Sequence, residues 1–141
     1  MILIKILFLQ NKLLNILFTI MKTYSFENLD VWKLSRELVV DVYKIQQSFP
    51  SIEKFGLGNQ LRRAVISIPS NIAEGSSRHS AKEQIHFIDI STGSLMEVYC
   101  QLLLAFDLNY ITSEQMETTS VKIERIEKML KGLRYRKLSS L

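Results

Sequence analysis

Residues 67–75 read Ser67-Ile68-Pro69-Ser70-Asn71-Ile72-Ala73-Glu74-Gly75 and place a proline among small polar residues inside an apolar segment. Around this stretch apolar residues recur on one helical face, at Leu61, Ala64, Val65, Ile68 and Ile72. Proline lacks a backbone N–H and clashes with the carbonyl four residues earlier, here that of Val65. The pattern predicts a helix from about Gly56 to Ser77. It either kinks at Pro69 or breaks there into two, and the Ser67 and Ser70 hydroxyls can satisfy loosened backbone groups.

The chain before this segment predicts one helix, from Asn28 or Asp30 to about Ser48, which Phe49-Pro50 ends. Its buried face is marked by spacings of three and four, at Val31, Leu34, Leu38, Val42, Ile45 and Phe49. A second apolar row lies off that face and consists of Trp32, Val39 and Tyr43. This row has two interpretations, the periphery of the core or a subunit interface.

The chain after Arg78 predicts a long third helix. Ser80-Ala81-Lys82-Glu83 has the pattern of a capping box. An apolar row follows in alternating steps of four and three, at Ala81, Ile85, Ile88, Thr92, Leu95, Tyr99, Leu102 and Phe106. Such a row is typical of helices that cross at shallow angles in four-helix bundles. Gly93-Ser94 within it permits close approach by another helix.

A fourth helix is predicted to start after Thr112 or Ser113, either of which can cap it. Its buried row is Met116, Thr119, Ile123, Ile126, Leu130 and Leu133. Because the connections between the four segments are short, the simplest topology is up-down-up-down. The sequence therefore predicts an all-α protein, an antiparallel four-helix bundle that forms a single domain over residues 21–141.

The first twenty residues differ from the rest, since they are almost entirely Ile, Leu, Phe, Lys and Asn and contain no acid. AT-rich upstream DNA encodes such a composition, and a second methionine follows at Met21. We expect Met21 to be the true start and residues 1–20 to be an upstream extension; if translated, they form a loosely attached apolar helix. A membrane anchor is disfavoured, because Gln10, Asn11 and Lys12 interrupt the apolar run.

Composition excludes several classes of protein. Of the 141 residues 47% are hydrophobic and only two are proline, which is unlike a disordered or fibrous chain. The single cysteine, Cys100, cannot form an internal disulfide, so a reducing cytoplasm fits best, and its apolar neighbours predict a buried thiol. The formal net charge is +4, and removing Lys5 and Lys12 leaves 16 Lys and Arg against 14 Asp and Glu. Overall charge is thus weak support for nucleic-acid binding.

No catalytic, metal or cofactor motif is found in the sequence. His79 and His86 lack nearby carboxylate or thiolate partners, and Ser67 and Ser70 have no adjacent base. Glycine-rich phosphate-binding patterns are missing as well. We therefore expect a protein that is not an enzyme and that requires no cofactor and no metal.

Two groups of residues are candidates for binding. A polar stripe on the second helix contains Ser67, Ser70, Asn71 and Glu74, flanked by arginines, and is either a solvated face or a recognition surface between subunits or towards a ligand. Two basic clusters could contact phosphates: one is Arg62, Arg63 and Arg78, and the other is Lys128, Lys131, Arg134, Arg136 and Lys137, with Tyr135 available for stacking.

Several motifs together resemble one family, the four helix bundle proteins that are also known as 23S rRNA-intervening-sequence proteins. These motifs are Phe26-Glu27-Asn28-Leu29 with Val31-Trp32, Gly56-Leu57, Gln60-Leu61-Arg62-Arg63-Ala64, the Ser67-to-Gly75 stretch, and Gly93-Ser94-Leu95-Met96-Glu97. The resemblance covers nearly everything from Tyr24 to about Leu138. It favours one kinked helix over two at Pro69.

The resemblance implies a ring-like homo-oligomer, in the family a homopentamer, and a relationship to accessory proteins of diversity-generating retroelements, which engage nucleic acid and a reverse transcriptase. We therefore expect a cytoplasmic oligomer that binds RNA or DNA through basic surfaces repeated around the ring. The competing hypothesis is a protein-interaction scaffold that does not touch phosphate. Trp32, Val39 and Tyr43, with the polar stripe, are the predicted interface residues, and no membrane partner is expected.

Overall fold

The computed structural model describes residues 6, 9–14, 16–17 and 23–141, and within these residues it contains helices and no strands. The long helices are α2 (Asp30–Ile45), α3 (Leu57–Ser76), α4 (Ala81–Asp107) and α5 (Ser113–Leu138). Short 3-10 helices are η1 (Ser25–Asn28), η2 (Gln46–Ser48) and η3 (Ser51–Lys54). The predicted all-α class is confirmed, and the four predicted helical segments correspond to α2, α3, α4 and α5.

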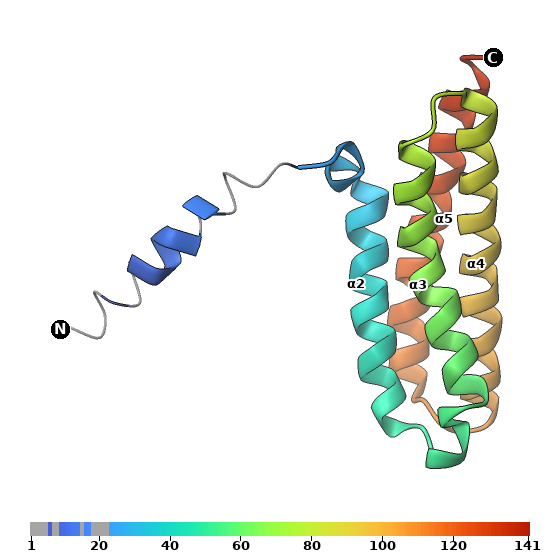
Figure 1. Cartoon of the computed structure of the whole chain (residues 1–141). Helices are drawn as coiled ribbons and strands as arrows, with labels where there is room; N and C mark the ends of the chain where they lie inside the picture. The colour runs from blue at the N-terminus through green and yellow to red at the C-terminus, as the bar shows by residue number, and fades with distance from the viewer. Residues whose placement is uncertain (1–5, 7–8, 15, 18–22) are drawn as a thin grey trace.

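The four long helices lie side by side, as Figure 1 shows. Helices α2 and α4 each pack against both α3 and α5, so they occupy opposite corners of the arrangement. The core between the helices is closed by side chains with no exposed surface, among them Leu38, Leu61, Leu95, Leu102 and Ile126. No helix in the described ranges is long and apolar enough to cross a membrane.

The ends of α4 and α5 follow the sequence predictions. The Ser80 hydroxyl accepts a hydrogen bond from the Glu83 backbone N–H, as expected for an N-cap. The same hydroxyl also lowers the pKa of the Glu83 carboxyl by donating to it. Thr112 caps α5 in a capping box with Gln115, whose side chain accepts from the Thr112 backbone N–H.

Helix α3 is continuous through Pro69, so the alternative of two separate helices is excluded. Side chains next to the proline bond to the backbone of the preceding turn. The Ser70 hydroxyl donates to the Ile66 carbonyl at 2.8 Å, and the Asn71 side-chain amide donates to the Ser67 carbonyl at 2.8 Å. Ser67 behaves differently from the expectation, because its hydroxyl bonds to the Ser94 hydroxyl on α4 at 2.8 Å.

The predicted buried face of α4 is wrong in part. Tyr99 and Phe106 are 37% and 39% exposed, whereas Ser91 and Ser94, outside the predicted row, are buried. Ser91 donates to the Ile68 carbonyl of α3, so small hydroxyl residues line the contact between these two helices. Cys100 is exposed, contrary to the predicted buried thiol. The apolar residues around it had suggested burial, but the outward face of α4 is itself apolar.

Close packing of α3 against α4 depends on Gly75 and not on Gly93. A Cβ atom on Gly75 would lie 2.8 Å from the Cβ of Phe87, whereas one on Gly93 would meet no heavy atom within 4 Å.

The predicted start at Met21 lies outside the described residues. Of residues 1–20, those that the structure describes are helical and exposed.

Candidate nucleic-acid interface

Arg62 is held inside the chain by two hydrogen bonds. Its guanidinium donates to the Gln46 side-chain oxygen at 3.0 Å and to the Lys54 carbonyl at 2.8 Å. Gln46 in turn donates to the Gly58 carbonyl at 2.9 Å. These bonds tie the connection between α2 and α3 to the start of α3. Arg62 is thus occupied by the fold, whereas its neighbour Arg63 is exposed and forms no ion pair with any described residue.

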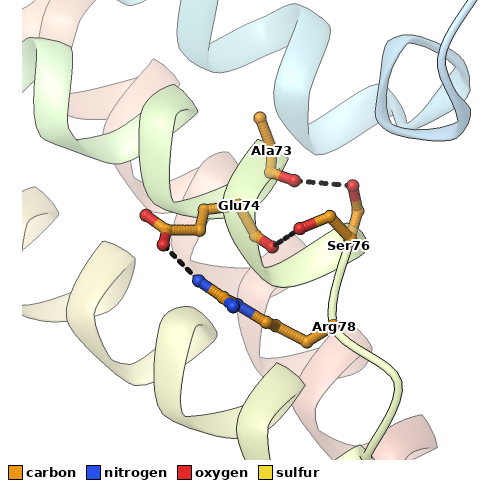
Figure 2. A network of polar contacts seen from close by, with 5 residues as sticks. Ala73, Glu74, Ser76 and Arg78 are labelled. Atoms are coloured by element: carbon orange, nitrogen blue, oxygen red, sulfur yellow. Dashed lines mark hydrogen bonds and ion pairs between the residues drawn. The ribbon is translucent and has the colours of Figure 1, made fainter.

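Arg78 lies at the opposite end of α3 and folds back on that helix, as Figure 2 shows. Its guanidinium pairs with the Glu74 carboxylate and lies over the Phe87 ring, 4.9 Å from the ring centre. Ser76 closes the same turn by donating to the Ala73 carbonyl at 2.7 Å. Much of the Arg78 charge is therefore balanced within the chain. Arg62, Arg63 and Arg78 lie along α3 and do not gather into one patch.

Three of the five predicted cations on α5 form ion pairs. Lys128 pairs with Glu124 at 2.7 Å, and Lys131 pairs with Glu127 at 2.7 Å. The hydrogen bond to Glu124 raises the pKa of Lys128. Arg134 reaches Asp89 on α4 at 2.7 Å, and this hydrogen bond raises its pKa. The five residues therefore do not act as one free basic surface.

The other two predicted cations of α5 lie at one end of the molecule, beside the start of α4. Arg136 and Lys137 belong to the last turn of α5, and Lys137 lines a cavity together with Gln84 of α4. Lys82 precedes Gln84 in the first turn of α4 and is exposed. None of the three cations forms an ion pair within the described part of the chain. We call Lys82, Arg136 and Lys137 the cationic end.

Tyr135, which is 73% exposed, adds an aromatic ring beside the cationic end. An exposed ring next to cations can stack on a nucleobase. Arg78 and Arg134 lie at this same end, because the Gln84 side chain donates to the Arg78 carbonyl and Arg134 binds Asp89 of α4. Lys82 was missed as a site residue because its pattern was interpreted as a helix cap alone. The contact between the start of α4 and the end of α5 brings it to the tail.

The cavity at this end measures about 260 Å³. Leu29, Ile72, Ile88 and Leu133 form its apolar lining. Small-molecule sites usually span roughly 300–1,000 Å³. The cavity is smaller than that range. Its lining shows which residues of α3, α4 and α5 lie together at this end of the molecule.

The predicted polar stripe is largely engaged within the chain. Ser67 and Asn71 bond to each other at 2.9 Å, and Ser67 bonds across to Ser94 of α4. Ser70 is exposed and donates to its own helix, and Glu74 pairs with Arg78. Ser67 and Asn71 thus join α3 to α4. A role for the four residues between subunits stays a prediction.

The predicted apolar row on α2 divides into two parts. Trp32 and Val39 are half-buried and pack against the core, as one of the two interpretations had it. Tyr43 is 44% exposed, and the adjacent Val40 is 52% exposed. Arg36 covers the Trp32 ring at 4.7 Å. The outward part of α2 therefore contains Arg36, Val40 and Tyr43.

No cluster of three or more His, Cys, Asp or Glu residues suited to a metal ion occurs among the described residues. His79 and His86 are both exposed. The contacts of the described residues add no support for the catalytic and metal-binding alternatives that the sequence disfavoured.

Comparison with known proteins connects the chain to one group. Residues 27–132 match the family model described as 23S rRNA-intervening sequence protein. A similar solved structure from Bacteroides thetaiotaomicron is described as a protein with unknown function from the S23 ribosomal protein family. The two chains are 26% identical with a TM-score of 0.69, and the match covers 74% of this chain and 97% of the other. No curated protein matches the sequence.

Proposed function

Since this chain belongs to the 23S rRNA-intervening sequence protein family, we propose that it is a non-enzymatic four-helix-bundle protein of the cytoplasm. In this proposal the bundle assembles into a ring-like homo-oligomer and binds RNA or DNA. The basic surface that contacts phosphate is the cationic end, with Tyr135 as a stacking platform. The family name refers to ribosomal RNA genes and is consistent with such a ligand without specifying it.

The observation that carries the proposal is the absence of ion pairs at Lys82, Arg136 and Lys137 among the described residues. Most other predicted cations are paired or bonded: Arg62, Arg78, Lys128, Lys131 and Arg134. An unpaired cation can bind phosphate and release a counterion without first breaking an internal bond. A ring would repeat the cationic end once per subunit, which raises the local potential well above that of one chain.

The test is binding of the protein to labelled duplex DNA and structured RNA between about 50 and 200 mM salt. The variant carries Lys82→Ala, Arg136→Ala and Lys137→Ala together. Each lost phosphate contact lowers the salt dependence on duplex DNA by about 0.9 in logarithmic slope. Losing three contacts would therefore remove about 40-fold of the change in affinity across that range.

The matched control is Lys128→Ala with Lys131→Ala, which removes charge from the same helix at residues already paired with glutamates. This control should retain more of the salt dependence than the triple variant. Equal losses in both variants would show that binding follows net charge and not the cationic end. A protein that stays oligomeric but binds neither nucleic acid at low salt would favour the scaffold hypothesis, in which the ring binds a protein partner.

A further inference from the structure

The outward face of α4 is apolar over its second half. Met96, Tyr99, Leu103, Leu104 and Phe106 are each more than a third exposed. They extend over about three helical turns, and the exposed Cys100 lies among them. Contiguous apolar patches of this kind on a helical protein mark interaction sites. We call these residues, with Glu97 and Asp107, the α4 face.

The outward face of α2 has the opposite charge. Its exposed apolar residues are Val40 and Tyr43, and Lys33, Arg36 and Lys44 lie on the same side at helical spacing. Of the acids of α2, Asp30 pairs with Lys33 at 3.5 Å, and Glu37 and Asp41 pair with Lys122 of α5 at 3.3 and 2.6 Å, so none of these acids offsets Arg36 or Lys44 by an ion pair. We call Arg36, Val40, Tyr43 and Lys44 the α2 face.

The charges on α4 complement this arrangement. Lys82, at the start of α4, is the one Lys or Arg of that helix, while Glu97 and Asp107 accompany its exposed apolar residues. Among the residues that the structure describes, Glu97 accepts only a hydrogen bond from Gln101, and Asp107 has no ion pair. Two α4 faces brought together would place carboxylates against carboxylates. An α4 face against an α2 face instead pairs acids with bases around an apolar centre.

The two faces also match in height along the molecule. Leu29, at the start of α2, and Ile88, near the start of α4, line the same cavity. At the other end, the Ser48 hydroxyl donates to the Tyr110 carbonyl at 2.9 Å. The two helices therefore run in parallel. Val40 follows Leu29 by the same number of residues as Tyr99 follows Ile88, so Val40 and Tyr99 lie at a similar height along the molecule. Copies related by rotation about an axis along the helices would place Val40 near Tyr99 and Cys100.

From these observations we infer that the α4 face of one copy docks on the α2 face of the next copy, a head-to-tail contact. Because α2 and α4 occupy opposite corners, the two faces of one copy are separate surfaces, and heterologous contacts of this kind generate a ring when the rotation between copies closes. This inference rests on the proposed self-assembly and adds to it which surfaces meet. It also gives the exposed apolar residues of α4 an occupant.

A single substitution tests the contact with the cysteine that the chain already has. In Val40→Cys, mild oxidation should link the introduced thiol of one copy to Cys100 of the next and give a ladder of cross-linked chains on a non-reducing gel. Adding Cys100→Ser should abolish the ladder. The unsubstituted chain should give none, whereas a Cys100-to-Cys100 dimer from it would overturn the head-to-tail contact in favour of a symmetric one.

A charge exchange gives an independent readout. Glu97→Lys with Asp107→Lys, and separately Arg36→Glu with Lys44→Glu, should each reduce the mass in light scattering to that of a single chain. The chain with all four substitutions should assemble again. If the wild type is oligomeric, but the Val40→Cys variant gives no ladder and both double variants keep the mass of the wild type, this contact alone would be overturned. A monomeric wild type would overturn the proposed self-assembly as well.

Discussion

Adding one methyl group at Gly75 should weaken the contact between α3 and α4. Gly75 is buried in the last turn of α3, and a Cβ atom there would lie 2.8 Å from the Phe87 Cβ and 3.6 Å from the Gln84 carbonyl oxygen. The Phe87 Cβ is attached directly to the backbone of α4, so it cannot move aside by a change of rotamer. Relieving the overlap requires the two helices to separate.

Gly132 provides the matched control, because a Cβ there would meet no heavy atom within 4 Å. Both glycines are in helices, so alanine gains helix propensity of about 0.5–1 kcal/mol at each position, and less near the end of α3. Overpacking at Gly75 costs about 1–3 kcal/mol. We therefore expect Gly132→Ala to stabilise the protein slightly and Gly75→Ala to be less stable than Gly132→Ala by about 1–3 kcal/mol.

The assay is urea denaturation followed by circular dichroism, at one protein concentration because assembly would make stability depend on concentration. The two variants should differ in midpoint with similar slopes. In a thermal scan, each 1 kcal/mol should correspond to roughly 4 °C in Tm for a chain of this size. If Gly75→Ala proved as stable as Gly132→Ala, the close approach of α3 and α4 at this position would be refuted.

Two further predictions concern charged residues that join helices. Burial lowers the pKa of Lys122, but its hydrogen bonds and charge attraction to Asp41 and Glu37 together raise that pKa by more. The pKa of Lys122 is therefore raised. Lys122→Met should therefore cost about 1 kcal/mol at neutral pH. This difference from wild type should persist below about pH 10.4 and disappear as pH rises through the higher folded pKa, as urea titrations at pH 8 and above would show. Arg62→Ala should cost about 1–2 kcal/mol by leaving Gln46 and a carbonyl without a donor. The salt dependence of nucleic-acid binding should stay the same; a reduced slope would return Arg62 to the phosphate-binding set.

Local patterns in the chain were enough for the helices and their caps. Ser80 was recognised from its own neighbours, because a capping box depends on residues three positions apart. For the last helix the sequence left Thr112 and Ser113 as alternatives, and the structure has Thr112 as the cap. The buried rows of α2 and α5 were also predicted well, since polar residues clearly separate the faces of these helices. Pro69 left two outcomes open, and the packed structure has the continuous helix.

The surface of α4 could not be inferred in this way. Apolar residues surround this helix on almost every side, so a periodic pattern could not tell that Tyr99 and Phe106 lie outward while Ser91 and Ser94 are buried. That choice depends on the neighbouring helix, because Ser91 and Ser94 face α3, where they bond to the Ile68 carbonyl and the Ser67 hydroxyl.

Whether a cation forms an ion pair likewise depends on residues that are distant in the sequence. Sequence position showed that Arg134 and Arg136 are close to each other, but Asp89, which pairs with Arg134 alone, is on another helix. Lys82 reached the candidate surface only because the start of α4 lies beside the end of α5. Helix formation is governed by residues a few positions apart, whereas burial and ion pairing are governed by residues that packing brings together from across the chain.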